Sequence, residues 1–332
     1  MLSLLPPTSY LLPGRKNLLA FSAGIDSSAL FFLLIENNIK FDIAIVDYGL
    51  REQSKEEVAH ARSLARQYNL VCHTVTAPQF TSHFEANARK FRYDFFESLI
   101  QTHGYDNLLT AHQLNDRLEW MLMRLAKGAG LVEMTGLEAV TQREGYTLLR
   151  PLLGYSKAEL LAYLEANNRP YFVDESNSDE RYERNSFRKH FSDPLIDTYT
   201  EGIKRSFDYL EADREALLSG YETLFLEKEL RVLKLHDTAA KTRAVDRTLK
   251  ALGYLLSASQ RQEIAQSDSL VVGRKWAVAH SDIYIFIAPY RTADMPKAFK
   301  EKCRVLKIPS KIRPYLFEEG IDPETILVKS EE

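Results

Sequence analysis

Short apolar runs alternate with longer segments of helical period through about the first 130 residues of this 332-residue chain. The apolar runs are NLLAFS, FDIAIVD, LVCHTV and NLLTAH, and the segments after them include DSSALFFLLIEN and LNDRLEWMLMRLAKG. A repeated strand and helix order is typical of a parallel sheet with helices on both faces. We therefore predict an α/β fold, a doubly wound parallel sheet of the Rossmann-like kind.

Three polar residues stand where predicted strands end: Ser22, Asp47 and His112. In open parallel sheets, ligands bind outside the carboxyl ends of the strands. We therefore expect a functional site at this edge.

The rest of the chain predicts a second, smaller unit. Residues 135–151 have the pattern of a hairpin, and Ser156 with Glu159 forms a capping box that opens a helix. A long helical pattern from about Glu201 to Glu229 leads to SLVVGRKWAVAHSDIYIFIAP, which we interpret as two strands. We place one domain at residues 1–200, and a helical linker with a smaller α+β domain at residues 201–332.

Composition excludes several classes of protein. Cys72 and Cys303 are the only cysteines and form no CxxC, which argues against a disulfide framework, a zinc knuckle or a cysteine-held iron-sulfur cluster and favours a reducing, cytoplasmic location. No run approaches the roughly 20 apolar residues of a membrane helix, and we expect the N-terminal MLSLLPPTSYLLPG to pack on the first domain. The net charge of −3 leaves a nucleic-acid partner open, because only local patches matter.

The stretch AFSAGIDSSA places small residues and a carboxylate between a predicted strand and a predicted helix. Ser22, Ala23 and Gly24 put backbone N–H groups at a helix start, which is where phosphate binds. The turn lacks the Lys-Ser/Thr ending of the GxxxxGKS loop. Asp26 would repel bare phosphate, so it indicates a nucleotide bound with Mg²⁺; the alternative is that Asp26 only caps the helix.

Two carboxylates follow in TAHQLNDRLEWMLMRL. Asp116 and Glu119 are three residues apart and share one face of a predicted helix. They could bind a metal, or hold and deprotonate an amine whose pKa near 10.4 otherwise keeps it protonated. The alternative is an acidic first turn that complements the helix dipole.

Basic residues cluster in RYERNSFRKH. Arg181, Arg184 and Arg188 share one helical face, which suits phosphate or charge that develops during nucleotidyl transfer. A solvated ion-pair network is the alternative. The same ambiguity applies to three residues of FEANARKFRY: Glu85, Arg89 and Arg92.

Taken together, these stretches resemble the PP-loop ATPases, whose SGGxDS turn grips the pyrophosphate of ATP. VDYGLR, FEANARKFRY, TAHQLNDRLE, LLRPLLGYSKAEL and VDESNSDERYERNSFR resemble, in this order, the tRNA(Ile)-lysidine synthetase family over about residues 18–190. In that family ATP adenylates the C2 oxygen of cytidine 34 in the CAU anticodon, and the lysine ε-amine then displaces AMP to give lysidine. The resemblance implies a carbon–nitrogen ligase that uses ATP, Mg²⁺, L-lysine and tRNA(Ile).

The resemblance also assigns roles to residues. It implies that Asp26 holds magnesium and pyrophosphate, that Asp116 and Glu119 handle lysine or metal, and that Arg184 or Arg188 is the basic group needed for turnover. The ATP turn would comprise Ser22, Ala23, Gly24, Ile25, Asp26 and Ser27. Substrate binding would involve Arg89, Arg92, His112, Asn185, Lys300, Lys302, Arg304 and Lys307.

Some positions depart from the family pattern. Ala23 replaces a glycine of SGGxDS, and if that position needs a positive φ, alanine carries a steric cost. Tyr48 replaces a histidine, and within AHHxDDxxET three further residues differ: Gln113, Asn115 and Trp120. Asn115 removes a charge from the acidic cluster, which disfavours a two-metal site.

Two alternative functions stay open at this point. One is another PP-loop adenylating enzyme, such as a tRNA thiolase or an amide-forming synthetase, although thiolases generally have cysteine motifs. The other is an inactive RNA-binding paralogue, which Ala23 and Asn115 motivate. The sequence leaves the oligomeric state open, with a homodimer as one option.

A basic stretch lies near the C-terminus, in PKAFKEKCRVLKIPSKIR. Residues 296–313 carry seven cationic side chains, and Glu301 is the only acidic one. Phosphate neutralisation by such a patch would supply salt-dependent tRNA affinity, whereas a solvated basic face is the alternative. Lys300, Lys302, Arg304 and Lys307 are the residues we expect to bind tRNA here.

Overall fold

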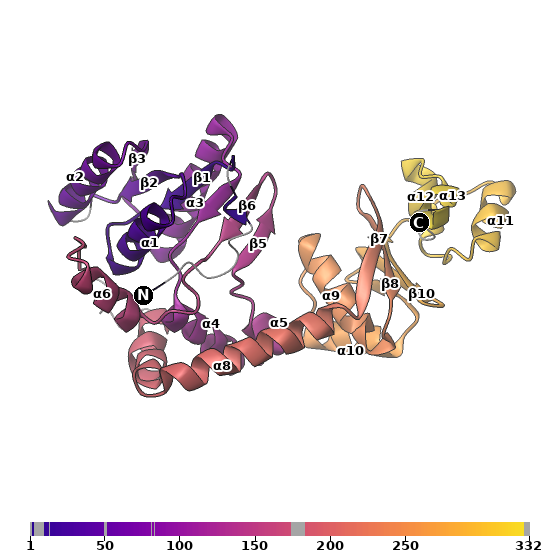
Figure 1. Cartoon of the computed structure of the whole chain (residues 1–332). Coiled ribbons are helices and arrows are strands. Elements are labelled where there is room, and N and C mark those ends of the chain that lie inside the picture. The colour runs from indigo at the N-terminus through magenta and orange to yellow at the C-terminus, as the bar shows by residue number, and fades with distance from the viewer. Residues whose placement is uncertain are drawn as a thin grey trace. The chain divides into compact units, whose positions relative to one another are not determined.

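The computed structural model divides into two compact units, Met1–Glu211 and Ala212–Glu332 (Figure 1). The structure describes residues 2, 10–12, 14–49, 52–80, 82, 84–173 and 183–328. None of the helices within those ranges has the length and apolar character needed to cross a membrane. Each unit is described by itself below.

The first unit contains a six-stranded sheet in the order β3-β2-β1-β4-β6-β5. Neighbouring strands are parallel except β5 and β6, which form the hairpin expected at residues 135–151. The predicted α/β class is therefore confirmed. The strands are β1 (Asn17–Ala20), β2 (Asp42–Asp47), β3 (Cys72–Thr76), β4 (Asn107–Leu109), β5 (Val140–Arg143) and β6 (Tyr146–Leu149).

Helices cover both faces of this sheet, because successive side chains of a strand point to opposite sides. Leu19 of β1 packs with α1 (Ile25–Glu36), α2 (Glu52–Gln67) and α6 (Lys157–Ala166). Its neighbour Leu18 packs with Phe96 of α3 (Phe84–His103) on the other face. The capping box of Ser156 and Glu159 opens α6 as expected.

Four helical segments complete the first unit and approach the carboxyl edge of the sheet. They are α4 (Leu114–Ala126), α5 (Leu131–Met134), α7 (Glu183–Phe187) and the π-helical turn η3 (Arg188–Ser192). The chain continues directly into α8 (Asp193–Leu218), which bends at Tyr199, where φ is −128° and ψ is 26°. Glu211, the last residue of the first unit, lies inside α8.

The second unit is built on a five-stranded antiparallel sheet in the order β7-β8-β11-β10-β9. One face packs on α9 and α10, and the other packs on α11, α12 and α13. The strands are β7 (Tyr221–Glu227), β8 (Leu230–Leu235), β9 (Ser269–Val272), β10 (Trp276–Ser281) and β11 (Tyr284–Pro289). The helical segments are η4 (Thr238–Ala240), α9 (Lys241–Ala251), α10 (Ala258–Gln266), α11 (Lys297–Val305), α12 (Arg313–Glu319) and α13 (Pro323–Val328).

Two expectations for this part of the chain were wrong. The helix expected to reach Glu229 ends at Leu218, because residues 221–227 pair with β8 as strand β7. Residues 269–289 form three strands instead of two, since tight turns at Arg274 and Asp282, both with positive φ, reverse the chain twice. Pairing between strands distant in sequence outweighed the local helical pattern.

Candidate active site

A cavity of about 520 Å³ opens at the carboxyl edge of the six-stranded sheet. Its size falls within the roughly 300–1,000 Å³ typical of small-molecule sites. Residues at the ends of β1, β2 and β4 line it, together with the first turns of α3 and with α7 and η3. The sequence-predicted residues on its wall are Ser22, Asp26, Ser27, Glu85, Arg89, Arg92, His112, Asp116, Arg184, Asn185 and Arg188.

The turn between β1 and α1 has the features of a phosphate site. The hydroxyl oxygens of Ser22 and Ser27 lie 3.1 Å apart, and the backbone N–H of Ser22 donates to Ser27 Oγ at 3.2 Å. Helix α1 begins at Ile25, and the first N–H groups of a helix have no partner inside it. These donors and the helix dipole point outward from the helix start and favour an anion there.

Ala23 adopts the left-handed backbone conformation, with φ of 59°, and its side chain is fully buried. This conformation costs an alanine about 1–2 kcal/mol. Two hydrogen bonds to its carbonyl oxygen hold it in place, one from Phe172 N at 2.9 Å and one from Ser28 Oγ at 3.1 Å. Alanine thus preserves the backbone shape at this position, with the steric cost anticipated from the sequence.

Asp26 does not cap α1, because Gly24 occupies the N-cap position. Its Oδ1 atom is buried and has no hydrogen-bond partner among the described residues. Burial and, second, the charge of Asp116 raise its pKa to about 7, although Lys157 and Arg188 act in the opposite direction. A half-buried carboxylate without a donor fits a cation ligand.

No group of three or more His, Cys, Asp or Glu side chains that could hold a metal occurs in the described part of the chain. Mg²⁺ is usually held by one or two carboxylates together with substrate phosphates. Asp26 beside the phosphate turn therefore fits a magnesium ion that arrives with a nucleotide, and it does not fit a dedicated protein cage.

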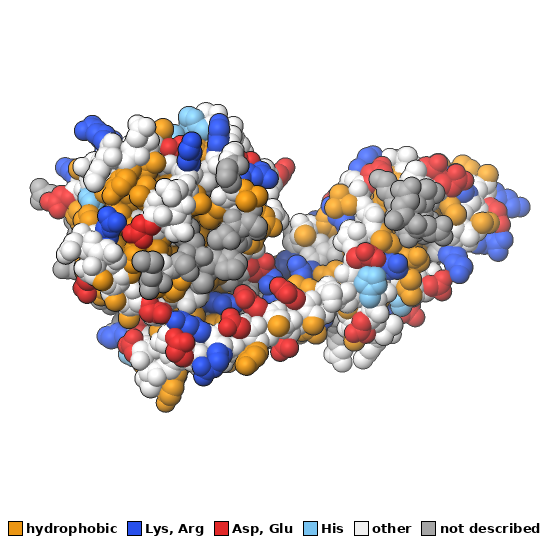
Figure 2. Space-filling view, viewed as in Figure 1, with side chains coloured by type: hydrophobic (Ala, Val, Ile, Leu, Met, Phe, Trp, Pro, Cys, Tyr) orange, Lys and Arg blue, Asp and Glu red, His pale blue; other side chains and the backbone are white. Residues whose placement is uncertain are grey.

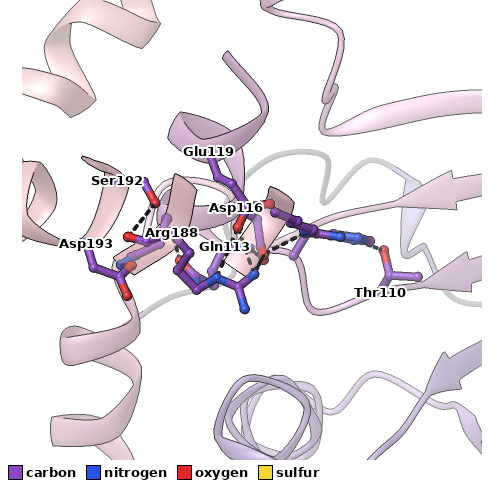
Figure 3. A network of polar contacts seen from close by, with 10 residues as sticks. Thr110, Gln113, Asp116, Glu119, Arg188, Ser192 and Asp193 are labelled. Carbon is purple, nitrogen blue, oxygen red and sulfur yellow. Dashed lines mark hydrogen bonds and ion pairs between the residues drawn. The ribbon is translucent and has the colours of Figure 1, made fainter. Parts of the chain in front are cut away.

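Asp116 and Glu119 of α4 face Arg184 and Arg188 in a compact ion-pair network (Figure 3). Asp116 Oδ1 accepts from Arg184 Nη2 at 3.1 Å and from Arg188 Nη2 at 3.0 Å. Glu119 Oε2 accepts from Arg188 Nε at 3.0 Å, and its other oxygen accepts from Arg184 Nε. Asp116 is 8% exposed and Glu119 is 2% exposed, so the two guanidinium groups balance two nearly buried negative charges.

The π-helical turn η3 keeps the arginines on the face toward α4. Arg184, Arg188, Ser192 and Ile196 are each four residues apart, a spacing that drifts by about 40° per step in a regular α-helix. A wider π-helical turn offsets this drift. Ser192 and Ile196 are accordingly buried, and Ile196 packs with Leu114 of α4.

The two carboxylates of α4 differ in acidity. Burial raises the pKa of Glu119 despite the nearby Arg184 and Arg188. Burial also acts to raise the pKa of Asp116, but its charged neighbours outweigh burial and hold that pKa below its usual range. Asp116 therefore stays ionised near neutral pH, while Glu119 is the better proton acceptor of the two.

His112 is uncharged at neutral pH. Burial lowers its pKa to about 4, and its Nδ1 lies 2.9 Å from Thr110 Oγ1. It lines the cavity beside Asp116. It therefore offers the cavity a neutral imidazole ring instead of a positive charge.

The departures from the family pattern in α4 have structural roles. Gln113 caps the helix, since its Oε1 accepts from Asn115 N at 2.5 Å. The second oxygen of Asp116 completes this capping box by accepting from Gln113 N at 3.1 Å. One oxygen of Asp116 therefore takes part in the helix cap, and the other accepts from the two arginines. Trp120 donates from Nε1 to the carbonyl oxygen of Glu133.

Some cavity residues carry no signal in a single sequence. Ser54, Glu57, Phe84 and Tyr93 line the cavity, but nothing in their local spacing indicates a site. Arg92 and Tyr48 approach each other on this wall, and burial raises the pKa of Tyr48 although Arg92 lowers it. Arg181 lies outside the described residues.

The basic stretch of residues 296–313 lies in the second unit, on α11 and on the connection from α11 to the start of α12, and carboxylates pair with much of it. Exposed carboxylates and cations are interspersed on this unit in the view of Figure 2. The pairs are Lys300 with Asp294 at 3.9 Å, Lys302 with Asp322 at 2.9 Å and Glu324 at 3.1 Å, Arg304 with Glu301 at 2.6 Å, and Lys307 with Asp282 at 3.0 Å. Exposed pairs of this kind contribute about 0–1 kcal/mol each, so phosphates can compete for these cations.

Comparison with known proteins gives the following relatives. The family described as PP-loop domain matches residues 5–195. A tRNA(Ile)-lysidine synthase of Campylobacter jejuni is 43% identical over 94% of this chain and 95% of its own length. The tRNA(Ile)-lysidine synthase of Wolinella succinogenes is 44% identical over 92% of this chain and 94% of its own length. That of Helicobacter pylori is 42% identical over 93% of this chain and 92% of its own length.

A solved structure shares the fold. A U34-tRNA thiolase from Methanococcus maripaludis, determined with its [4Fe-4S] cluster, aligns with a TM-score of 0.50 at 17% identity. The alignment covers 62% of this chain and 74% of that one. At this identity the likeness extends to the fold only.

Asp26→Asn should stabilise the protein in the absence of nucleotide, in a pH-dependent way. The folded-state pKa of about 7 lies above the ordinary 3.8, so the folded form binds the proton more tightly and the free energy of unfolding falls as the pH rises from about 4 to about 7. We expect the variant to melt a few °C above the wild type at pH 8, with a difference that shrinks as the pH is lowered. Thermal melts from pH 5 to 8, with the exposed Asp197→Asn as control, test this; a difference that does not change with pH would contradict it.

Proposed function

This chain belongs to the tRNA(Ile)-lysidine synthase family of PP-loop proteins, and from that membership we propose its reaction and the roles of its residues. The reaction is the ATP-dependent attachment of lysine to cytidine 34 in the CAU anticodon of tRNA(Ile), with release of AMP and pyrophosphate. One structural observation carries the assignment of roles. Asp116 lies on the same cavity wall as the phosphate turn and Asp26. Glu119, a second buried carboxylate of different acidity, lies outside that wall and pairs with Arg184 and Arg188, which line the cavity.

The first step forms an adenylated cytidine. The C2 oxygen of cytidine 34 attacks the α-phosphorus of ATP, and the bond from that phosphorus to the bridging oxygen breaks to release pyrophosphate. The first N–H groups of α1 and the hydroxyl groups of Ser22 and Ser27 hold the pyrophosphate in place. Asp26 would hold Mg²⁺, which supplies a charge that neutralises the phosphate oxygens.

The second step transfers the amine. The ε-amine of lysine attacks C2 of the cytidine, and the bond between C2 and the adenylate oxygen breaks to release AMP. The ε-ammonium group must lose two protons, one before the attack on C2 and one after it. Asp116, which stays ionised, attracts the ammonium group, and Glu119, whose pKa is raised, accepts the proton.

Arg184 and Arg188 would also stabilise negative charge on the leaving groups. Arg184 and Arg188 already balance the charges of Asp116 and Glu119, so an arriving ammonium group adds a third cation beside two carboxylates. Charge balance favours the movement of one guanidinium toward the phosphates, where it can stabilise the negative charge of the departing pyrophosphate or AMP. Both arginines line the cavity, so either guanidinium could approach a phosphate bound there.

The alternative functions have less support. A thiolase of the cluster-containing kind needs cysteine ligands, and this chain has only Cys72 and Cys303, one in each unit. An inactive RNA-binding paralogue was motivated by Ala23 and Asn115, but Ala23 keeps the left-handed turn and Asn115 has a structural role. Formation of AMP and pyrophosphate separates an enzyme from a binding protein.

The proposed reaction is tested with purified protein, ATP, lysine and a tRNA(Ile) transcript that carries CAU. Mass analysis of nucleoside 34 should show lysidine, and Asp26→Ala should abolish it, because the variant loses the carboxylate at the phosphate turn. The fold of the variant should persist, since Asp26 forms no hydrogen bond through Oδ1 among the described residues. Near-normal turnover by folded Asp26→Ala would refute the role of this carboxylate.

Glu119→Gln and Asp116→Asn should impair amine transfer more than adenylation. An amide keeps the shape of the side chain but cannot hold or deprotonate an ammonium group. We expect pyrophosphate release with tRNA to survive in part, while lysidine formation falls by about 10²–10⁴-fold, the usual contribution of a general base. The two half-reactions are measured on the same preparation, so each variant is its own control. An equal loss of both would favour a metal-binding role instead.

Replacement of Lys300, Lys302, Arg304 and Lys307 by serine should weaken tRNA binding and leave ATP binding unchanged. With fewer phosphate contacts, binding releases fewer counterions. The slope of log affinity against log salt should therefore flatten by somewhat under one for each cation removed. Binding is measured by filter retention at several salt concentrations.

A matched variant removes four cations from the opposite, amino edge of the sheet in the first unit: Arg15, Lys16, Lys40 and Arg66. It changes the net charge equally, so a general charge effect would weaken tRNA binding by both variants alike. Unchanged affinity and salt slope in the 300–307 variant would refute this assignment.

A further inference from the structure

Asn115 is a buried residue of α4 whose side chain does not enter the cavity. It is 4% exposed, and it is absent from the cavity wall although its neighbour Asp116 lines it. Its Nδ2 donates to Asp193 Oδ1 at 2.8 Å. Its Oδ1 accepts from the backbone N–H of Lys157 at 3.2 Å. One side chain therefore connects the start of α4 to the starts of α8 and α6.

This position uses both halves of an amide. The carbonyl oxygen meets a donor and the amino group meets a carboxylate, and an asparagine is the side chain of this size that supplies both. An aspartate of the same shape would keep the contact with Lys157 N. It would also bring a second negative charge to within hydrogen-bond distance of Asp193, in a site of low exposure where like charges repel strongly.

The bond connects the two sides of the ion-pair network. Asn115 directly precedes Asp116 in the chain, and Asp193 directly follows the π-helical turn that begins with Arg188 (Figure 3). Ser192 Oγ donates to the Arg188 carbonyl oxygen at 3.3 Å, so Asp193 is coupled to the arginine through that turn. A shift of the first residues of α8 away from α4 would carry Arg188 with it.

We propose that Asn115 is a positioning residue, which holds η3 against α4 through Asp193 and thereby sets Arg188 opposite Asp116 and Glu119. The inference rests on the proposed function, because its measured consequence is the rate of lysidine formation. It assigns a role to a residue that contacts no substrate. It also explains why the AHHxDDxxET pattern can have an asparagine here, since the amide is required by Asp193.

Packing alone does not fix this geometry. Ile196 packs against Leu114 and Leu118 and keeps α8 near α4. Apolar contacts are non-directional, so they do not supply the directional contact that the amide makes with Asp193. Loss of the amide contact should therefore change the reaction more than it changes the stability of the fold.

The test is a charge-exchange cycle with Asn115→Asp, Asp193→Asn and the double variant. Asn115→Asp keeps the acceptor for Lys157 N, but it removes the donor to Asp193 and introduces repulsion between the two carboxylates. Asp193→Asn leaves an amide that can still accept from Asn115. The double variant restores an acceptor facing a donor with the direction of the bond reversed. Asp197→Asn, an exposed residue one turn further along α8, is the matched control for the loss of a carboxylate.

We expect Asn115→Asp to lower kcat for lysidine formation about tenfold and Asp193→Asn to lower it less than threefold. The double variant should return to within about threefold of the wild-type kcat, because contacting residues are energetically coupled. The KM for ATP should stay unchanged, because the phosphate turn is untouched. The melting temperatures of all variants, and the activity of Asp197→Asn, should stay close to those of the wild type.

Wild-type kcat in Asn115→Asp, or a double variant as slow as Asn115→Asp, would overturn the inference. If Asn115→Asp does not fold, the double variant decides: an active double variant supports the pairing and an inactive one overturns it. The proposed function fails separately, through absence of lysidine in the wild-type reaction, and the cycle is then measured through pyrophosphate release.

Discussion

The ion-pair network of Asp116 and Glu119 with Arg184 and Arg188 is the interaction on which the candidate site depends. A buried carboxylate without a partner is strongly destabilising, and removal of one partner from a buried pair typically costs about 3–5 kcal/mol. Burial of two carboxylates on α4 therefore requires that α7 and η3 pack against this helix. The same packing places Asp116, Arg184 and Arg188 on one wall of the cavity, while Glu119 lies outside that wall.

The turn from β1 into α1 contains two locally unfavourable features, one in the backbone and one at a buried oxygen. Ala23 has a strained backbone, and a buried oxygen of Asp26 has no donor among the described residues, yet both lie next to a large apolar core that includes Leu19, Leu30 and Phe31. Strained and unsatisfied groups persist only where the surrounding structure fixes them. The core therefore preserves the turn that we propose holds pyrophosphate and Mg²⁺.

The second unit contributes a different kind of surface. Its cations lie in exposed ion pairs that are worth little in water, and none of the four expected tRNA-binding residues is buried. Phosphate can replace carboxylate at such cations with little loss of stability to the fold. The first unit thus concentrates buried charge at its cavity, while the second carries exposed, exchangeable charge.

The sequence by itself determined the α/β class, the parallel strands, the hairpin at residues 135–151 and the placement of Ser22 and His112 near one edge of the sheet. These follow from local periodicity and from the rule that strand ends share an edge. Local periodicity misjudged residues 221–227, because their partner strand β8 decided their conformation. Only the tertiary structure decided that Glu119 faces two arginines more than 60 residues away, that Asp26 Oδ1 is buried with no donor in the described part of the chain, and that Asn115 bonds to Asp193. Burial and pairing between distant residues set these properties, and neither is encoded in the spacing of residues along one helix.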